Sequence, residues 1–271
     1  MMEGRNLINA VGIPLLLLLI IQGGIYYSIF ILIASVLALG EFYTIMENKG
    51  AKPLRWMGMA STVFIADYYY VQPLTSAHDI LGGIILIIIL TCIWELFSIK
   101  ENSSLNISTT LSGILFISVL MCTAIDIRQF DHLMSTNLTL ALITSVWVCD
   151  AAAFILGTAF GVKKIFPEVS PNKSWVGSIS GLIAAEIIML AFHYQGWLGS
   201  YFTLHDAIAL GLISGFFGQI GDFTESLLKR DAGLKDSGSL LAGHGGVLDR
   251  FDSLIFAMPV SYLYIHFIMH I

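Results

Sequence analysis

Residues 80–97 read ILGGIILIIILTCIWELF, and Glu95 is the only charged side chain in this stretch. A helix of about 20 predominantly apolar residues is long enough to cross the hydrocarbon core of a bilayer. The stretch is therefore predicted to be a membrane-spanning helix. Similar apolar runs, separated by short polar breaks, occur on both sides of it along the chain. Most of the chain is therefore expected to lie within a membrane.

The composition supports this expectation. Of the 271 residues, 56% are hydrophobic and 12% are charged, and the mean hydropathy is +0.83. A typical soluble domain has about 25% charged residues. The 13 Lys+Arg and 19 Asp+Glu of this chain are too few to cover the surface of a soluble protein of its size. A soluble enzyme, a nucleic-acid-binding protein and a disordered chain are therefore excluded, and no nucleic-acid partner is expected.

The apolar runs predict the fold class: all-α, a polytopic integral membrane helical bundle with about nine transmembrane helices. Eight spans is the alternative, because the first run is short and the third contains Asp67. We expect a single membrane domain over residues 1–271, with N-terminal spans in 1–137 and catalytic spans and cytoplasmic loops in 138–271. The nine predicted spans cover residues 7–22, 25–45, 57–73, 80–99, 107–125, 138–160, 175–195, 205–221 and 253–271.

Lysine and arginine divide unequally between the two sides of this nine-helix arrangement. The side that holds the N-terminus receives twelve of them, and the other side receives only Arg128. Short cytoplasmic loops are enriched in these residues. The N-terminus is therefore predicted to be cytoplasmic, in a multi-pass protein of the inner (cytoplasmic) cell membrane.

Charge is concentrated between Asp222 and Asp252, a segment with six acids and four bases. In GDFTESLLKR (221–230), the polar positions Asp222, Glu225 or Ser226, and Lys229 recur at helical spacing, so they share one helix face. This face begins at membrane depth, where ionisable groups are costly and usually functional. A site is therefore favoured over an ordinary solvated loop.

The segment GHGG (243–246) adds three glycines around one histidine, and LDRFD (248–252) follows it. Glycines let the backbone approach a ligand closely, and exposed N–H groups in such a loop suit phosphate oxygens. Carboxylates beside such a loop can hold Mg²⁺ together with substrate phosphates. These features predict a site for a nucleotide triphosphate.

A second polar cluster, SPNKS (170–174), precedes the predicted span at 175–195. Hydroxyls and an ammonium at a helix N-terminus suit an anion. A plain N-cap at Ser174 with an interfacial lysine is an equal alternative.

The stretch from Ser226 to Asp252 closely resembles the signature of phosphatidate cytidylyltransferases, also called CDP-diacylglycerol synthases. The resemblance extends upstream to the WVCD and SPNKS segments and so covers about residues 140–271 with motifs. One departure is Ala242, where the family usually has proline two residues before the histidine. This exchange removes no functional group, so activity is expected to survive.

The resemblance implies that CTP and phosphatidate react to give CDP-diacylglycerol and pyrophosphate, at a site facing the cytoplasm. It also implies dependence on Mg²⁺, with K⁺ as a candidate second ion. A homodimer packed through the glycine-bearing spans is a further expectation. The expected catalytic residues are Asp222, Asp249, Lys229, Arg230, Lys235, Asp236, His244 and Arg250. The expected substrate-binding residues are Ser170, Lys173, Ser174, Ser226, Gly245, Gly246 and Asp150, and the expected metal ligands are Asp222, Asp249 and Asp252.

Two alternatives stay open. A membrane transferase that uses CTP with a different lipid phosphate would carry the same motifs. A transporter would instead use acids within its spans, such as Asp67, Asp150 and Glu186. Asp150 is as well explained by a structural pairing with a base as by a substrate role. Glu41 and Glu95, near the predicted cytoplasmic ends of their spans, are expected only to extend toward the interface.

Overall fold

The structure is a computed structural model that describes residues 2–71, 77–98, 101–129, 134–238 and 245–269. Within these residues the chain is almost entirely helical, which confirms the predicted all-α membrane bundle. The helices are α1 (Met2–Gln22), α2 (Gly24–Glu47), α3 (Arg55–Val71), α4 (Ala77–Ser98), α5 (Ser103–Gly113), η1 (Ile114–Val119), α6 (Leu120–Ile127), α7 (Met134–Phe160), α8 (Trp175–Tyr194), α9 (Leu204–Asp231), α10 (Leu248–Tyr264) and η2 (Ile265–Met269).

Each of the nine predicted spans falls on a helical segment of this structure. Seven segments are long and apolar enough to cross a membrane: α2, α4, the continuous α5–η1–α6 segment, α7, α8, α9, and α10 with η2. The other two predicted spans fall on shorter helices. These are the apolar part of α1 (Gly12–Gln22) and the 17-residue α3.

Two helix boundaries differ from the predicted spans in ways that bear on the site. α9 continues to Asp231 instead of ending at residue 221, and α10 begins at Leu248 instead of residue 253. The extension of α9 is polar, so its hydropathy does not mark it as helix, but the Glu225–Lys229 pair and the basic last turn favour helix there. The charged segment is therefore built on two helices.

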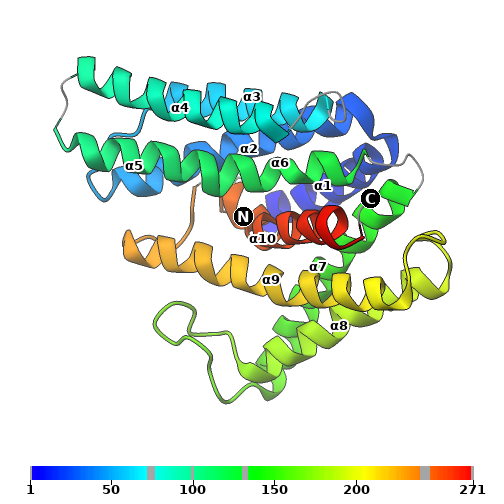
Figure 1. The fold of residues 1–271 in the computed structure, drawn as a ribbon. Helices are drawn as coiled ribbons and strands as arrows, with labels where there is room; N and C mark the ends of the chain where they lie inside the picture. Colours follow the sequence, from blue (N-terminus) through cyan, green and yellow to red (C-terminus); the bar gives the residue numbers. More distant parts are fainter. Residues whose placement is uncertain (1, 72–76, 99–100, 130–133, 239–244, 270–271) are drawn as a thin grey trace.

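α10 runs through the middle of the molecule (Figure 1). It packs against α9 on one side and against α6 and α2 on the other. Val247, Leu248 and Ile255 join Leu39 and Phe42 of α2 in a buried apolar cluster. This cluster holds the beginning of α10 beside the C-terminal half of α2.

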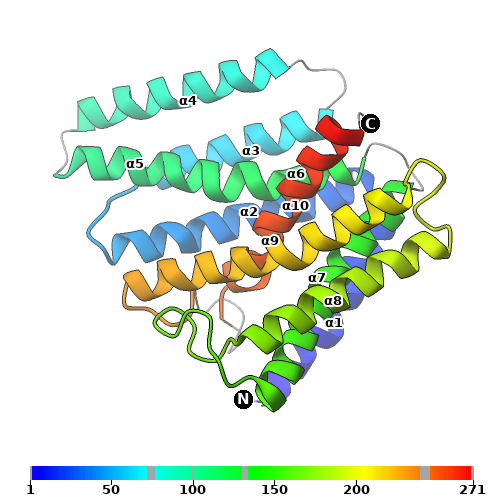
Figure 2. The same cartoon turned by 60° about the horizontal axis from the view of Figure 1, so that its bottom comes forward.

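The helices α7, α8 and α9 pack closely against one another (Figure 2). A Cβ at Gly177 of α8 would lie 2.6 Å from the Ala153 carbonyl oxygen of α7, and one at Gly215 of α9 would lie 2.8 Å from Leu182 of α8. Small residues at a contact between helices let the two backbones approach closely. These glycines are therefore used within one chain, and the homodimer stays a prediction.

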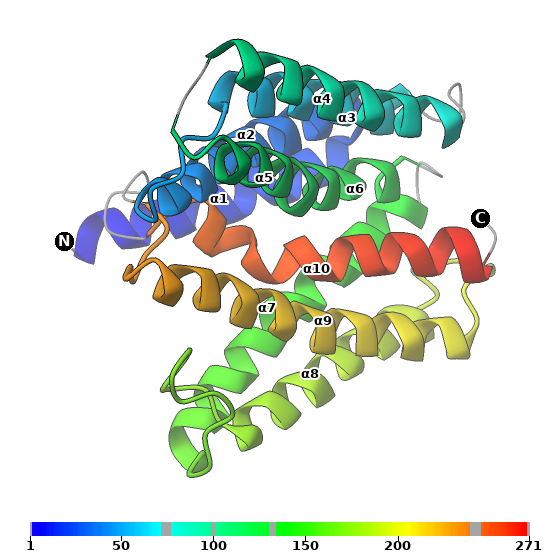
Figure 3. The ribbon, with the colours of Figure 1, turned by 60° about the vertical axis from the view of Figure 1, so that its left-hand side comes forward.

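The two ends of the described chain lie on opposite sides of the molecule (Figure 3). The connections α2–α3 and α7–α8 and the residues that follow α9 lie on the side of the N-terminus. This is the alternation that an odd number of crossings produces.

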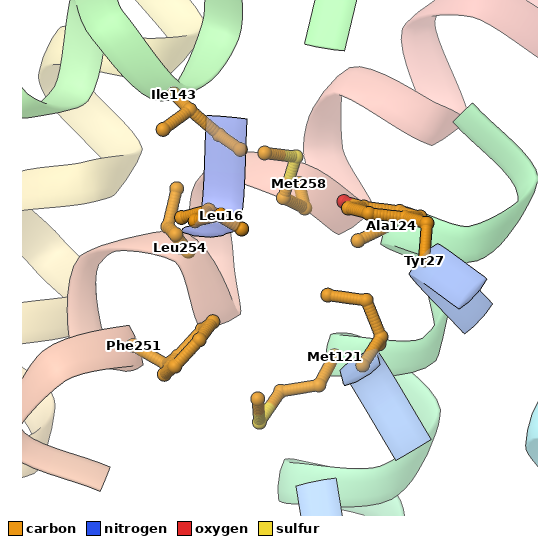
Figure 4. A pocket seen from close by; sticks show the side chains of 9 residues that line it. Leu16, Tyr27, Met121, Ala124, Ile143, Phe251, Leu254 and Met258 are labelled. Atoms are coloured by element: carbon orange, nitrogen blue, oxygen red, sulfur yellow. The ribbon is translucent and has the colours of Figure 1, made fainter. Parts of the chain in front are cut away.

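A small apolar cavity lies between α1, α2, α6, α7 and α10 (Figure 4). The Tyr27 hydroxyl, at the cavity wall, has no hydrogen-bond partner among the described residues. The cavity is lined by Leu16, Tyr27, Ile31, Met121, Ala124, Ile143, Phe251, Leu254 and Met258.

Candidate functional site

The charged residues of the C-terminal segment meet where the end of α9, the start of α10 and the loop before α8 come together. Asp222, Glu225 and Lys229 lie along α9 with the predicted helical spacing. Asp249 and Asp252 lie in the first turns of α10. The structure thus brings together acids and bases from separate segments of the sequence.

The first ion pair joins Lys173 to Asp222. The loop that carries Lys173 folds back on itself, since Ile165 N donates to Lys173 O at 3.2 Å. The loop also packs on α9 through Phe166 and Phe223, whose ring centroids are 5.1 Å apart. The Lys173 ammonium lies 4.5 Å from the centroid of the Phe223 ring. The loop therefore holds this ammonium over α9.

In the second ion interaction, one lysine contacts two acids, and these side chains are more buried than those of Lys173 and Asp222. Lys229 Nζ lies 2.5 Å from Glu225 Oε2 and 2.6 Å from Asp249 Oδ1. Glu225 is 1% exposed and Lys229 is 9% exposed. A buried charge without a partner is strongly unfavourable, so each of these groups depends on the other two. The ammonium joins α9 to α10.

Asp249 also binds the glycine-rich loop. Its Oδ2 accepts hydrogen bonds from Gly246 N at 2.7 Å, Ser237 N at 3.1 Å and Ser237 Oγ at 3.0 Å. Gly245 has φ +78°, a left-handed conformation that favours glycine, and its Cβ would overlap the Asp249 carboxylate. The loop therefore closes tightly on Asp249.

Asp150 and Asp252 complete an acidic group around Asp222. Asp150 Oδ2 lies 3.5 Å from the hydroxyl of Ser253, the residue that follows Asp252. With Asp222, Glu225 and Asp249, these residues give the site five carboxyl groups. Only Lys173 and Lys229 form ion pairs with them among the described residues. In the described part of the site, carboxyl groups therefore outnumber the lysines that pair with them.

Ser174 caps the N-terminus of a helix, which was the alternative to a role in an anion site. It is the N-cap of α8, its hydroxyl accepts from Gly177 N at 3.2 Å, and it is 2% exposed. Ser170 lies half-buried in the same loop. Of this loop, Lys173 alone is seen in an ion pair with the site.

Other predicted residues lie at the rim. Arg230 donates to the carbonyl oxygens of Val169 at 3.3 Å and Leu234 at 3.1 Å, so it ties the end of α9 to the loop before α8. Ser226 lies 3.5 Å from Asp222 Oδ1 through its hydroxyl. Lys235, Asp236 and Arg250 are exposed. His244 and Ala242 lie outside the described residues.

Glu41 of α2 is the residue that the sequence interpretation missed. It was expected to extend toward the interface, but it is only 9% exposed. Its carboxylate accepts from Val247 N at 2.9 Å, Leu248 N at 2.8 Å and Ser237 Oγ at 2.9 Å. The only signal for it in the sequence is an acid at the end of an apolar run. Its partners lie about 200 residues away along the chain, so no local pattern reveals them.

Glu95 was also expected to extend toward the interface, and this was wrong as well. It is 1% exposed and accepts from Asn106 Nδ2 at 2.7 Å, because α4 packs on α5 there. The acids that a transporter would use lie on three different helices, α3, α7 and α8. Asp67 is exposed on α3, and both oxygens of Glu186 on α8 lack a hydrogen-bond partner among the described residues.

The chain is similar to known proteins over most of its length. The sequence model of the cytidylyltransferase family matches residues 3–268. The phosphatidate cytidylyltransferase of Synechocystis sp. is 32% identical over 97% of this chain and 97% of its own. That of Bacillus subtilis is 29% identical over 96% of both chains. That of Haemophilus influenzae is 45% identical over 44% of this chain and 42% of its own. The chain belongs to the cytidylyltransferase family.

Proposed function

We propose that this protein is a phosphatidate cytidylyltransferase, which converts CTP and phosphatidate to CDP-diacylglycerol and pyrophosphate. The three relatives described above are all named phosphatidate cytidylyltransferases. The observation that carries the proposal is that two lysine–aspartate pairs hold ammonium groups in the site, one of them in contact with the glycine-rich loop through Asp249. Ammonium groups held in this way suit the phosphates of both substrates.

The reaction brings two anions together. A phosphate oxygen of phosphatidate attacks the α-phosphorus of CTP in line, and pyrophosphate leaves. The nucleophile is already an anion, so no strong general base is needed. Catalysis then consists of positioning and of neutralising charge in the transition state. Lys173 and Lys229 are held by Asp222 and Asp249 in positions where they serve this purpose.

The acidic residues fit a divalent cation. Among the described residues five carboxyl groups lie near two ammonium groups, and carboxylate oxygens are ligands that Mg²⁺ prefers. Among the described residues, no three His, Cys, Asp or Glu side chains are arranged to hold an ion alone. Mg²⁺ would therefore bind Asp222, with Asp249 or Asp252, and complete its shell with substrate phosphates and water. Bound there, it supplies charge neutralisation and alignment of the phosphates.

The location follows from the same proposal. CTP is a cytoplasmic metabolite, so the site would face the cytoplasm, as the lysine and arginine count predicts. The N-terminus lies on the same side of the molecule as the loop before α8. It would then be cytoplasmic too.

The first prediction tests the reaction directly. Purified protein in detergent is given [α-³²P]CTP and phosphatidate, with and without Mg²⁺, and label in chloroform-extractable lipid is measured. Label is expected to appear with Mg²⁺ and to fall at least about 100-fold in Asp249→Asn, because the amide loses the charge that holds Lys229. K⁺ is varied in the same assay as the candidate second ion.

Asp67→Asn is the matched control, since it makes the same change at an exposed acid on α3. It is expected to retain wild-type activity. A transporter would be affected at Asp67 and would transfer no label. Folded wild-type protein that labels another lipid phosphate, but not phosphatidate, would overturn the substrate assignment and leave the cytidylyl transfer intact.

A further inference from the structure

The start of α10 is capped by a side chain from the other half of the protein. Val247, at the N-cap position, makes no side-chain capping bond. The free N–H groups of Val247 and Leu248 instead donate to Glu41 of α2, one to each carboxylate oxygen. A carboxylate at a helix N-terminus is favourable because the first N–H groups lack intrahelical partners and carry partial positive charge.

Glu41 also lies close to the site through Ser237. The Ser237 hydroxyl lies 2.9 Å from Glu41 Oε2 and 3.0 Å from Asp249 Oδ2. A hydroxyl has one proton to donate, so it links the two carboxyl groups by serving one of them at a time. Asp249 in turn contacts the Lys229 ammonium. A chain of contacts therefore runs from Glu41 to Asp249 and Lys229.

The Glu41 carboxylate leaves no room for a side chain at two nearby glycines. A Cβ at Gly238 would lie 2.8 Å from Glu41 Oε1, and one at Gly246 would overlap the Glu41 carboxylate and the Ser237 hydroxyl. Gly246 also donates its N–H to Asp249. Gly238 and Gly246 can therefore lie against Glu41, and Gly246 can also reach Asp249, only because these positions lack side chains.

We propose that Glu41 is a positioning residue for the reaction. It orients Ser237 and the first residues of α10, up to Asp249, without touching substrate, by fixing the N–H groups of Val247 and Leu248 and the hydroxyl of Ser237. This inference rests on the proposed function, because the reaction supplies the purpose of that orientation. It also explains why an acid is placed in the α2 span.

Glu41→Gln is the sharpest test. Both carboxylate oxygens accept from an N–H or O–H group, so an amide of the same size must point its NH₂ at a donor in either orientation. The matched control is Glu95→Gln, which makes the same change at an equally buried acid bonded to Asn106 and not in contact with the loop. Glu41→Asp keeps the charge but shortens its reach, and an intermediate effect is expected.

Two measurements are made on each variant in detergent. In Glu41→Gln the kcat of label transfer is expected to fall roughly 10- to 100-fold, because small displacements of catalytic groups have effects of this size. The Mg²⁺ concentration for half-maximal rate is expected to rise, while the KM for phosphatidate stays unchanged. Hydrogen exchange in the peptide of residues 245–252 is expected to become at least about tenfold faster at Val247 and Leu248, because their N–H groups lose a carboxylate acceptor. Glu95→Gln is expected to change none of these values.

Each outcome decides the proposal. Wild-type exchange at residues 245–252 in Glu41→Gln would overturn it, and so would wild-type kcat. An equal loss of activity in Glu95→Gln, with equal loss of thermal stability, would reduce Glu41 to a general structural role and also overturn it. If the wild type transfers no cytidylyl group, the proposed function fails, whereas the exchange measurement still shows whether Glu41 orders the loop.

Discussion

At the scale of single residues, the site is organised by ion pairs between lysine and acidic side chains. Lys229 lies between Glu225 and Asp249, and Lys173 lies beside Asp222. In a low-dielectric environment each ion is stabilised mainly by its partner, so these contacts determine where the charges lie. Helical spacing in the sequence predicted that Asp222, Glu225 and Lys229 share a face, and the structure places them along α9. The pairing of each base with its acid depends on how α9, α10 and the α7–α8 loop pack.

A prediction at this scale concerns Lys173, which forms an ion pair with Asp222. Replacing it with glutamine removes the ammonium and leaves the carboxylates near Asp222 without their counter-charge. The kcat/KM for CTP is expected to fall about 100-fold, or ~2.7 kcal/mol of transition-state stabilisation. Lys163→Gln, at an exposed lysine of the same loop, serves as the control. Equal activity in the two variants would remove Lys173 from the site.

At the scale of helices, the close approach of α7, α8 and α9 positions the loop and α9 relative to each other. This approach depends on glycine, as Gly177 shows, because its neighbours include the backbone of α7, which cannot move aside. In the sequence, Gly177 and Gly181 lie four residues apart, a spacing that lets helix backbones approach closely. It did not predict the true ends of α9 and α10, since hydropathy marks only the part of a helix that contacts lipid or core.

Gly177→Ala is therefore expected to destabilise the protein by about 1–3 kcal/mol, the usual effect of overpacking. Its thermal stability in detergent should fall below that of the wild type. Gly82→Ala on α4 is the control, because a Cβ there meets nothing within 4 Å. Alanine at that position is expected to leave stability unchanged or raise it by roughly 0.5–1 kcal/mol through helix propensity. A Gly177→Ala protein as stable as the wild type would contradict the packing argument.

At the scale of the whole molecule, the chain forms a membrane bundle in which the halves are joined at the site. α10 packs on α9 from the C-terminal half and on α2 and α6 from the N-terminal half. Glu41 adds a polar contact to this interface. The N-terminal helices therefore do more than hold the protein in the membrane, because they also support the loop that binds Asp249.

The last prediction concerns orientation. The described ends lie on opposite sides of the molecule, and the positive residues favour the side of the N-terminus. Green fluorescent protein fused to the N-terminus is expected to stay in the cytoplasm and fluoresce. Green fluorescent protein fused to the C-terminus is expected to be exported and not to fluoresce. Alkaline phosphatase fusions should give the reverse result. Fluorescence from both ends would point to an even number of crossings.

The sequence by itself determined the membrane class, the approximate spans and the residues that make up most of the site. These follow from local properties: the length of an apolar run, the spacing of polar residues on one helix and a glycine-rich motif. Only the tertiary structure decided that the Ser174 hydroxyl is a buried cap and that Glu41 holds the start of α10. The physical reason is that such contacts join segments distant in sequence, and they exist only once helix packing has brought those segments together.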